Sequence, residues 1–211
     1  MNAPDYDDIV RAAAGHCLDV MGGVHEDDGT VILLGPSPGF WPMMIATPEM
    51  QDGAPDPIDR WSRRVIGDLA LALGAEALFP FGGPPYLPFL RWAVESGRAW
   101  QSPAGMLVHD VAGMMVSYRG ALRFSQKIVL PATGRSPCET CADQPCMTAC
   151  PVDALSAARG YDVAACHGFL NTQAGRDCLS EGCKARRVCP VSQTFGRDPE
   201  QSAFHMTYFH R

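Results

Sequence analysis

The stretch Cys138-Glu-Thr-Cys141-Ala-Asp-Gln-Pro-Cys146-Met-Thr-Ala-Cys150-Pro151 is the densest group of cysteines in the chain and ends in a Cys-Pro pair. A second set follows it and again ends in Cys-Pro: Cys166, Cys178, Cys183 and Cys189-Pro190. Eight of the nine cysteines therefore lie within about fifty residues. Thiolates are soft ligands, so this density indicates bound metal.

The first run nearly repeats the bacterial pattern C-x2-C-x2-C-x3-C-P, whose thiolates hold iron–sulfur clusters, with two residues added between its second and third cysteines. In two-cluster proteins the fourth cysteine of such a run commonly ligates the other cluster. We therefore expect two 4Fe-4S clusters. The predicted metal ligands are Cys138, Cys141, Cys146 and Cys189 for the first cluster, and Cys150, Cys166, Cys178 and Cys183 for the second. Cys17 is left over and is interpreted as a small buried residue.

Three other uses of the cysteines stay open at this point. Two structural zinc sites with four cysteines each would also use eight thiolates, although the paired Cys-Pro endings favour clusters. Cys138-x-x-Cys141 could be a thioredoxin-type redox pair, but no βαβ unit leads into it. Disulfides are the third alternative. Four basic residues near the second set would either stabilise a reduced cluster or be solvated: Arg176, Lys184, Arg186 and Arg187.

Composition limits the class of protein. Hydrophobic residues make up 46% and charged residues 19% of the 211 residues, which is typical of a globular chain. The formal charge of −6 argues against nonspecific nucleic-acid binding. No apolar run is long enough to span a membrane, and the acidic start lacks the features of a signal peptide. We therefore expect a cytoplasmic protein, in which cysteines bind metal rather than form disulfides.

Residues 1–130 are predicted to form a mixed α+β domain, and residues 131–211 a cysteine-rich domain with a C-terminal tail. Helical spacing over residues 5–21 predicts a helix that Gly22-Gly23 would end. Residues 40–46 are either a helix or a strand. The other expected helices cover residues 58–73, with Asp56 as the cap and Gly74 at the end, and residues 86–97; the expected strands cover residues 31–34, 77–80, 106–109 and 114–124, the last two as a hairpin.

Several residues upstream of the cysteines are candidates for a second cofactor site: Gly82, Gly83, His109, Tyr118 and Arg119. The two glycines would let the backbone approach a flat ligand, or would simply form a tight connection. His109 is either a structural histidine or a ligand. Tyr118 and Arg119 either face a substrate or pair with neighbouring carboxylates.

Two further patterns have plain interpretations. Arg60, Arg63 and Arg64 form either a solvated helix face or an anion site. Gly35-Pro-Ser-Pro38-Gly39 matches the nucleophile elbow of hydrolases, but Pro38 lacks the N–H that the oxyanion hole requires.

The two cysteine runs together resemble the C-terminal iron–sulfur module of epoxyqueuosine reductases and reductive dehalogenases. In that module an isolated cysteine completes the second cluster, which would be the role of Cys166. More faintly, Asp56-Pro-Ile-Asp59 and the segment Leu107-Val-His-Asp to Gly120 resemble the cobalamin-processing domain of the same superfamily. The resemblance implies a nitroreductase-like N-terminal domain and a C-terminal domain similar to bacterial ferredoxin.

Two functions follow from these observations. The first is electron transfer through the two clusters to a redox partner protein or a small-molecule acceptor. The alternative is a reductase whose clusters feed a corrinoid (cobalamin) or a flavin in the N-terminal domain; in that case the protein would be an enzyme. The aromatic tail over residues 204–210 is expected to dock on its own chain or on a second copy.

Overall fold

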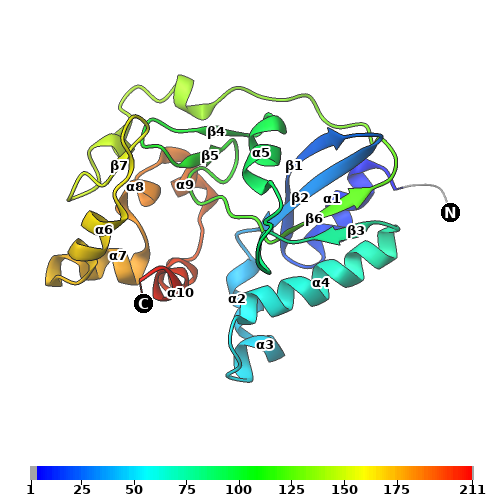
Figure 1. The fold of residues 1–211 in the computed structure, drawn as a ribbon, viewed down its shortest axis with the longest axis horizontal. Helices are drawn as coiled ribbons and strands as arrows, with labels where there is room; N and C mark the ends of the chain where they lie inside the picture. The colour runs from blue at the N-terminus through cyan, green and yellow to red at the C-terminus, as the bar shows by residue number, and fades with distance from the viewer. Residues whose placement is uncertain (1–3, 211) are drawn as a thin grey trace. The chain divides into compact units, whose positions relative to one another are not determined.

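The computed structural model describes residues 4–210, so the first three residues and Arg211, at the ends of the two predicted domains, lie outside it. The chain forms two compact units (Figure 1). The first, here the sheet unit, comprises Met1–Arg98 and Ser117–Gly134; the second, here the cysteine unit, comprises Ala99–Val116 and Arg135–Arg211. Residues 99–116 thus belong with the cysteine-rich part. Both units combine helices with small sheets, so the chain is α+β.

The sheet unit is built on a four-stranded antiparallel sheet with the strand order β1-β2-β6-β3. The central strand β2 is buried along nearly its whole length because neighbouring strands and helices cover it. The strands are β1 (Leu18–Glu26), β2 (Gly29–Pro36), β3 (Glu76–Leu78) and β6 (Gly120–Phe124). The helices are α1 (Tyr6–Ala14), α2 (Phe40–Ile45), α3 (Pro48–Gln51), α4 (Pro57–Leu73) and α5 (Phe89–Glu95).

Helix α4 packs against β3 and β6 and supplies much of the apolar core of this unit (Figure 1). Its boundaries confirm the predicted helix over residues 58–73, and Gly74 ends it in the left-handed conformation with φ 67°. Asp56 stands at the N-cap position, but its φ of 53° is left-handed and its side chain makes no capping hydrogen bond, so the predicted side-chain cap is wrong. Its buried face includes Trp61, whose ring meets that of Phe40 edge-on with centroids 5.1 Å apart. With 17 residues it is the longest helix between residues 4 and 210, and none of the helices there is long and apolar enough to cross a membrane.

The predicted helix over residues 5–21 is correct only in its first half. Helix α1 ends at Ala14, the chain turns at Cys17 with φ 54°, and β1 begins at Leu18. Pairing of β1 with β2 outweighs the local helical pattern, and a bulge between Val20 and Gly22 fits the two glycines into the strand. Cys17 is half-buried rather than fully buried.

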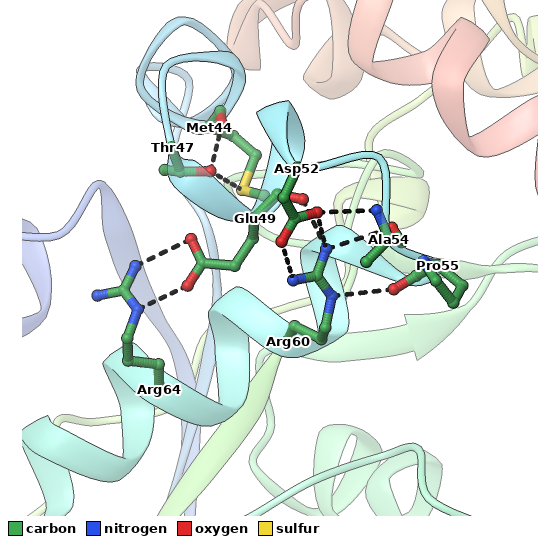
Figure 2. Close-up of polar contacts among 8 residues, drawn as sticks. All are labelled: Met44, Thr47, Glu49, Asp52, Ala54, Pro55, Arg60 and Arg64. Atoms are coloured by element: carbon green, nitrogen blue, oxygen red, sulfur yellow. Dashed lines mark hydrogen bonds and ion pairs between the residues drawn. The ribbon is translucent and has the colours of Figure 1, made fainter.

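Arg63 and Arg64 of α4 are exposed, as the solvated-face interpretation expected, but Arg60 and Arg64 also bind carboxylates of the chain (Figure 2). The Arg60 guanidinium donates to both carboxylate oxygens of Asp52, at 2.7 and 2.8 Å, and to the carbonyl of Glu49 at 2.7 Å. Arg64 donates to the Glu49 carboxylate at 2.6 and 3.1 Å. These contacts fasten α3 and the following loop to α4, so the chain's own carboxylates occupy the place of an external anion.

The cysteine unit consists of short elements. It has two two-stranded sheets, formed by β4 with β5 and by β7 with β8. The strands are β4 (Ala99–Gln101), β5 (Leu107–His109), β7 (Leu155–Ser156) and β8 (Gly160–Tyr161). The 3-10 helices are η1 (Pro137–Glu139), η2 (Pro145–Met147) and η3 (Gln173–Gly175). The α-helices are α6 (Val163–Leu170), α7 (Arg176–Glu181), α8 (Lys184–Arg187), α9 (Pro190–Phe195) and α10 (Pro199–Phe209).

The predicted hairpin over residues 106–124 is wrong. Strand β5 pairs with β4 in the cysteine unit, whereas β6 pairs with β2 and β3 in the sheet unit. Residues 114–119 contain no strand. Alternation of apolar residues indicates a strand but does not identify its partner, which explains the error.

The tail forms α10, which packs on α7 of the same chain. The Phe209 ring stacks on Tyr161 with centroids 6.1 Å apart and meets the His167 ring edge-on at 4.7 Å. The tail was expected to dock on its own chain or on a second copy, and in the structure it docks on its own chain.

The hydrogen bonds of Thr30 provide a test of what stabilises the sheet unit. Its buried hydroxyl donates to the carbonyl of Gln126 at 3.1 Å and accepts the N–H of Ile128 at 2.9 Å. We expect Thr30→Val to leave these two backbone groups unpaired and to lower the free energy of unfolding by about 1–3 kcal/mol. Urea denaturation followed by tryptophan fluorescence measures this loss. The same change at exposed Thr133 is the control, and equal stability of both variants would contradict the prediction.

Candidate functional site

The first candidate site is a cavity of about 220 Å³ in the cysteine unit. Four thiols are in its wall, those of Cys138, Cys141, Cys146 and Cys189. The rest of the wall is mainly apolar and includes Val108 and Met114, which are buried. Among residues 4–210 no Lys, Arg, His, Asp or Glu lines this cavity.

Short turns place these four cysteines. Pro137 and Pro145 start the 3-10 helices η1 and η2, so that Cys138 and Cys146 are the second residue of each turn. Cys189 is the N-cap of α9, and Pro190 occupies the first helical position, where a missing N–H costs nothing. The Cys-Pro pair thus lets a helix start directly after a cysteine.

A hydrogen bond to Ser192 holds Met114, which lines the first cavity. The Ser192 hydroxyl accepts the N–H of Met114 at 2.9 Å. Gly113 has φ 56°, and a Cβ there would lie 2.4 Å from the Ser192 nitrogen, so only glycine fits. The loop between β5 and Met114 is therefore held closely against α9.

The second candidate site is a separate cavity of about 210 Å³ in the same unit. Its wall contains the other four thiols, those of Cys150, Cys166, Cys178 and Cys183. Cys166 comes from α6, Cys178 from α7, and Cys183 is the N-cap of α8. Side chains of α10 cover part of the cavity, including His205 and Phe209.

Thiols that raise the pKa values of one another belong to the same group of four. Burial raises the pKa of Cys146, and the neighbouring thiols of Cys138, Cys189 and Cys141 raise it further. Burial likewise raises the pKa of Cys138, and Cys189 and Cys141 add to the shift.

The second set behaves in the same way. Burial raises the pKa of Cys166, and Cys183 and Cys150 raise it further, while a hydrogen bond from Tyr161 acts in the opposite direction. Burial and the Cys183 thiol raise the pKa of Cys178, against a hydrogen bond from the backbone of Lys184. Thus the thiols that influence one another line the same cavity.

The structure therefore brings the eight cysteines together in two non-overlapping groups, which are the two groups expected from sequence; their binding of metal stays a prediction. Cys17 lies in the sheet unit and in neither group. Within the described range no three His, Cys, Asp or Glu side chains converge as they would around a single ion. The thiols instead border cavities large enough for a group of several atoms.

Three hydrogen bonds reach sulfurs of the second group. The N–H of Ala154 donates to the Cys150 sulfur at 3.3 Å, the N–H of Lys184 to Cys178, and the Tyr161 hydroxyl to Cys166. Donors of this kind stabilise thiolates and tune bound clusters. No sequence pattern points to Tyr161, because only folding brings this residue of β8 to Cys166.

The basic residues predicted near the second group differ in their roles. Lys184 and Arg186 line the second cavity, and so does Arg197, which was not predicted. Arg187 instead pairs with the carboxylates of Asp177 and Glu181. Arg176 is exposed and is not part of the cavity wall.

The candidate residues for a second cofactor are divided between the units. Gly82, Gly83, Tyr118 and Arg119 belong to the sheet unit, and His109 belongs to the cysteine unit. The His109 ring is completely buried, and its Nδ1 accepts the N–H groups of Val111 and Ala112 at 3.1 and 3.2 Å. This corresponds to the structural role that was one of its two interpretations.

Arg119 pairs with a neighbouring carboxylate. Its guanidinium lies 3.2 Å from Asp59 and 5.8 Å from the centroid of the Phe81 ring, over which Arg63 also lies at 4.8 Å. Burial raises the pKa of Asp59 and lowers that of Arg119, and the ion pair between them opposes both shifts. Binding of a cofactor near Gly82 and Gly83 stays a prediction.

Searches against protein-family models, curated proteins and solved structures found no match to this chain.

The raised thiol pKa values predict a pH dependence for metal-free protein. A group whose pKa is higher in the folded state contributes stability below its unfolded pKa and loses it as the pH rises through the folded pKa. We therefore expect the melting temperature of reduced, metal-free protein to fall between about pH 8 and pH 10, where free thiols ionise. Calorimetry over this range measures the dependence. Cys146→Ser should flatten it, and a melting temperature that rises with pH would contradict it.

Proposed function

We propose that the cysteine unit binds two 4Fe-4S clusters and that the protein transfers electrons between redox partners. The observation that carries the proposal is the sorting of eight thiols into the walls of two cavities, four in each. A similarity of this unit to bacterial ferredoxins is part of the proposal.

The donor set and the cavities suit such clusters better than the alternative uses of cysteine. A structural zinc ion binds four sulfurs directly at about 2.3 Å, which leaves no space between them. Here the sulfurs border cavities of about 210 and 220 Å³. All nine cysteines are free thiols, so the structure contains no disulfide.

The residues of the chain would perform three tasks. The eight thiolates would hold the clusters, and the apolar walls would exclude water, which influences the potential. The donors from Ala154, Lys184 and Tyr161 would stabilise charge on the second group of sulfurs. When bound, the clusters would supply reversible one-electron chemistry.

A reductase is the second candidate function. The observation in its favour is the open backbone at Gly82 and Gly83, which have φ values of 113° and 102°. A Cβ added at Gly83 would meet no atom within 4 Å, so a flat corrinoid or flavin could approach the main chain there. This function would fit the nitroreductase-like character that the resemblance implies for the sheet unit.

Spectroscopy of protein purified without oxygen separates these functions. Iron and sulfide analysis together with electron paramagnetic resonance should give about eight iron atoms per chain and the signals of reduced clusters. An additional corrinoid or flavin absorption band would identify the reductase. Colourless protein that contains zinc and no labile sulfide would refute both proposals.

Substitution of one cysteine from each group tests the ligand sets. We expect Cys141→Ala and Cys183→Ala each to reduce the iron content by about half, because each removes a ligand of one cluster. Each should also destabilise the cysteine unit. Cys17→Ala is the matched control and should keep the full iron content. Unchanged iron in both ligand variants would contradict their assignment, and loss of iron in the control would contradict that of Cys17.

A further inference from the structure

The two cavities differ in charge although each has four thiols. As described above, no charged side chain lines the first cavity within residues 4–210. The second is lined by Lys184, Arg186, Arg197 and His205, and by no Asp or Glu in the same range. A negative charge is therefore more stable in the second cavity, because attraction to nearby cations is strong where water is excluded.

Arg186 is the cation with the clearest effect. The Lys184 ammonium lies 3.2 Å from the Asp177 carboxylate, which cancels part of its field. Arg186 makes no ion pair with any residue from 4 to 210 and is only partly exposed. Its positive charge therefore acts on the second cavity without a neighbouring carboxylate.

Two acidic residues lie close in sequence to the cysteines of the first cavity but outside its wall. Glu139 and Asp143 lie on the loop between Cys138 and Cys146, and both are exposed. Neither has an ion-pair partner in the described part of the chain. Hydrogen-bond donors differ less between the cavities, because Cys138 also has a donor in Ser136 and Cys146 has a backbone donor. The main difference between the cavities is therefore charge.

Tyr161 adds a donor whose position is well defined. Its hydroxyl donates to Cys166, and its ring stacks on Phe209 of α10 with an angle of 11° between the planes. Phenylalanine would preserve the stacking and remove only the O–H group. This makes Tyr161 a positioning residue whose contribution to the potential can be isolated.

We propose that the second cavity is the electron-accepting end of this pair of sites, and that Arg186 and Tyr161 raise the reduction potential of the cluster held there above that of the first. The inference rests on the proposed function. One electron leaves the first site and one enters the second, without movement of a proton or formation of a bond. The electron comes from a one-electron donor of lower potential than both sites.

Redox titration with dithionite, monitored by electron paramagnetic resonance, tests the proposal on the intact protein. The wild type should show two reduction steps. In Arg186→Gln and in Tyr161→Phe the step at higher potential should move down and the other should stay in place. For Arg186→Gln we expect the ratio of reduced to oxidised cluster at a fixed potential to fall about tenfold, equivalent to about 59 mV for one electron. Arg159→Gln removes the same charge from an exposed position outside the cavity wall and is the control.

Each outcome decides a separate point. Movement of the lower step, or no movement in either variant, would overturn the inference while leaving the clusters established. An equal shift in Arg159→Gln would also overturn it, because the effect would then reflect net charge alone. Full iron content in all variants shows that the sites are loaded. Wild-type protein without iron would refute the proposed function itself, and the inference with it.

Discussion

The arrangement of the cysteine unit depends on the cost of placing four sulfurs around a buried space. Burial and mutual repulsion raise the pKa of thiols in both groups, so ionised sulfur is unfavourable there without positive charge. A bound metal group would remove this cost and release the thiol protons, which couples binding to folding. The stability of the fold around the cavities would therefore depend on what the cavities bind.

Backbone geometry accounts for much of how the sulfurs reach the cavity walls. In both groups a cysteine stands at the start of a helix, Cys189 before α9 and Cys183 before α8. At such a position the first N–H groups have no partner within the helix, and neither sulfur accepts a capping hydrogen bond from them. The same local solution thus serves both groups.

The amount that could be predicted from sequence differs between the site and the fold. The grouping of the cysteines was predictable because closely spaced residues such as Cys138 and Cys141 cannot lie far apart, and because the last cysteine of a Cys-Pro run commonly ligates the other cluster, which assigned Cys189 to the first group. The helical spacing of apolar residues in α4, followed by Gly74, was also sufficient to predict the boundaries of this helix. The pairing of β1 and the partner of β5 were not predictable, because they depend on contacts between distant segments. Tyr161 and Arg197 were missed for the same reason, since only folding brings them to the cavity.

The boundary predicted after residue 130 lies close to the division after Gly134, but residues 99–116 belong to the other unit, and this matters for the first cavity. Residues 99–116 lie in sequence between α5 and β6 of the sheet unit but belong to the cysteine unit. They contribute Val108 and Met114 to the cavity wall, where these side chains pack with Cys146 and Cys189. A fragment that starts at residue 131 would keep all eight cysteines of the two groups and lose this apolar wall. The first group of thiols would then face water, so a complete set of ligands is not by itself a complete site. The segment between α5 and β6 therefore belongs to the candidate site as much as the cysteine runs do.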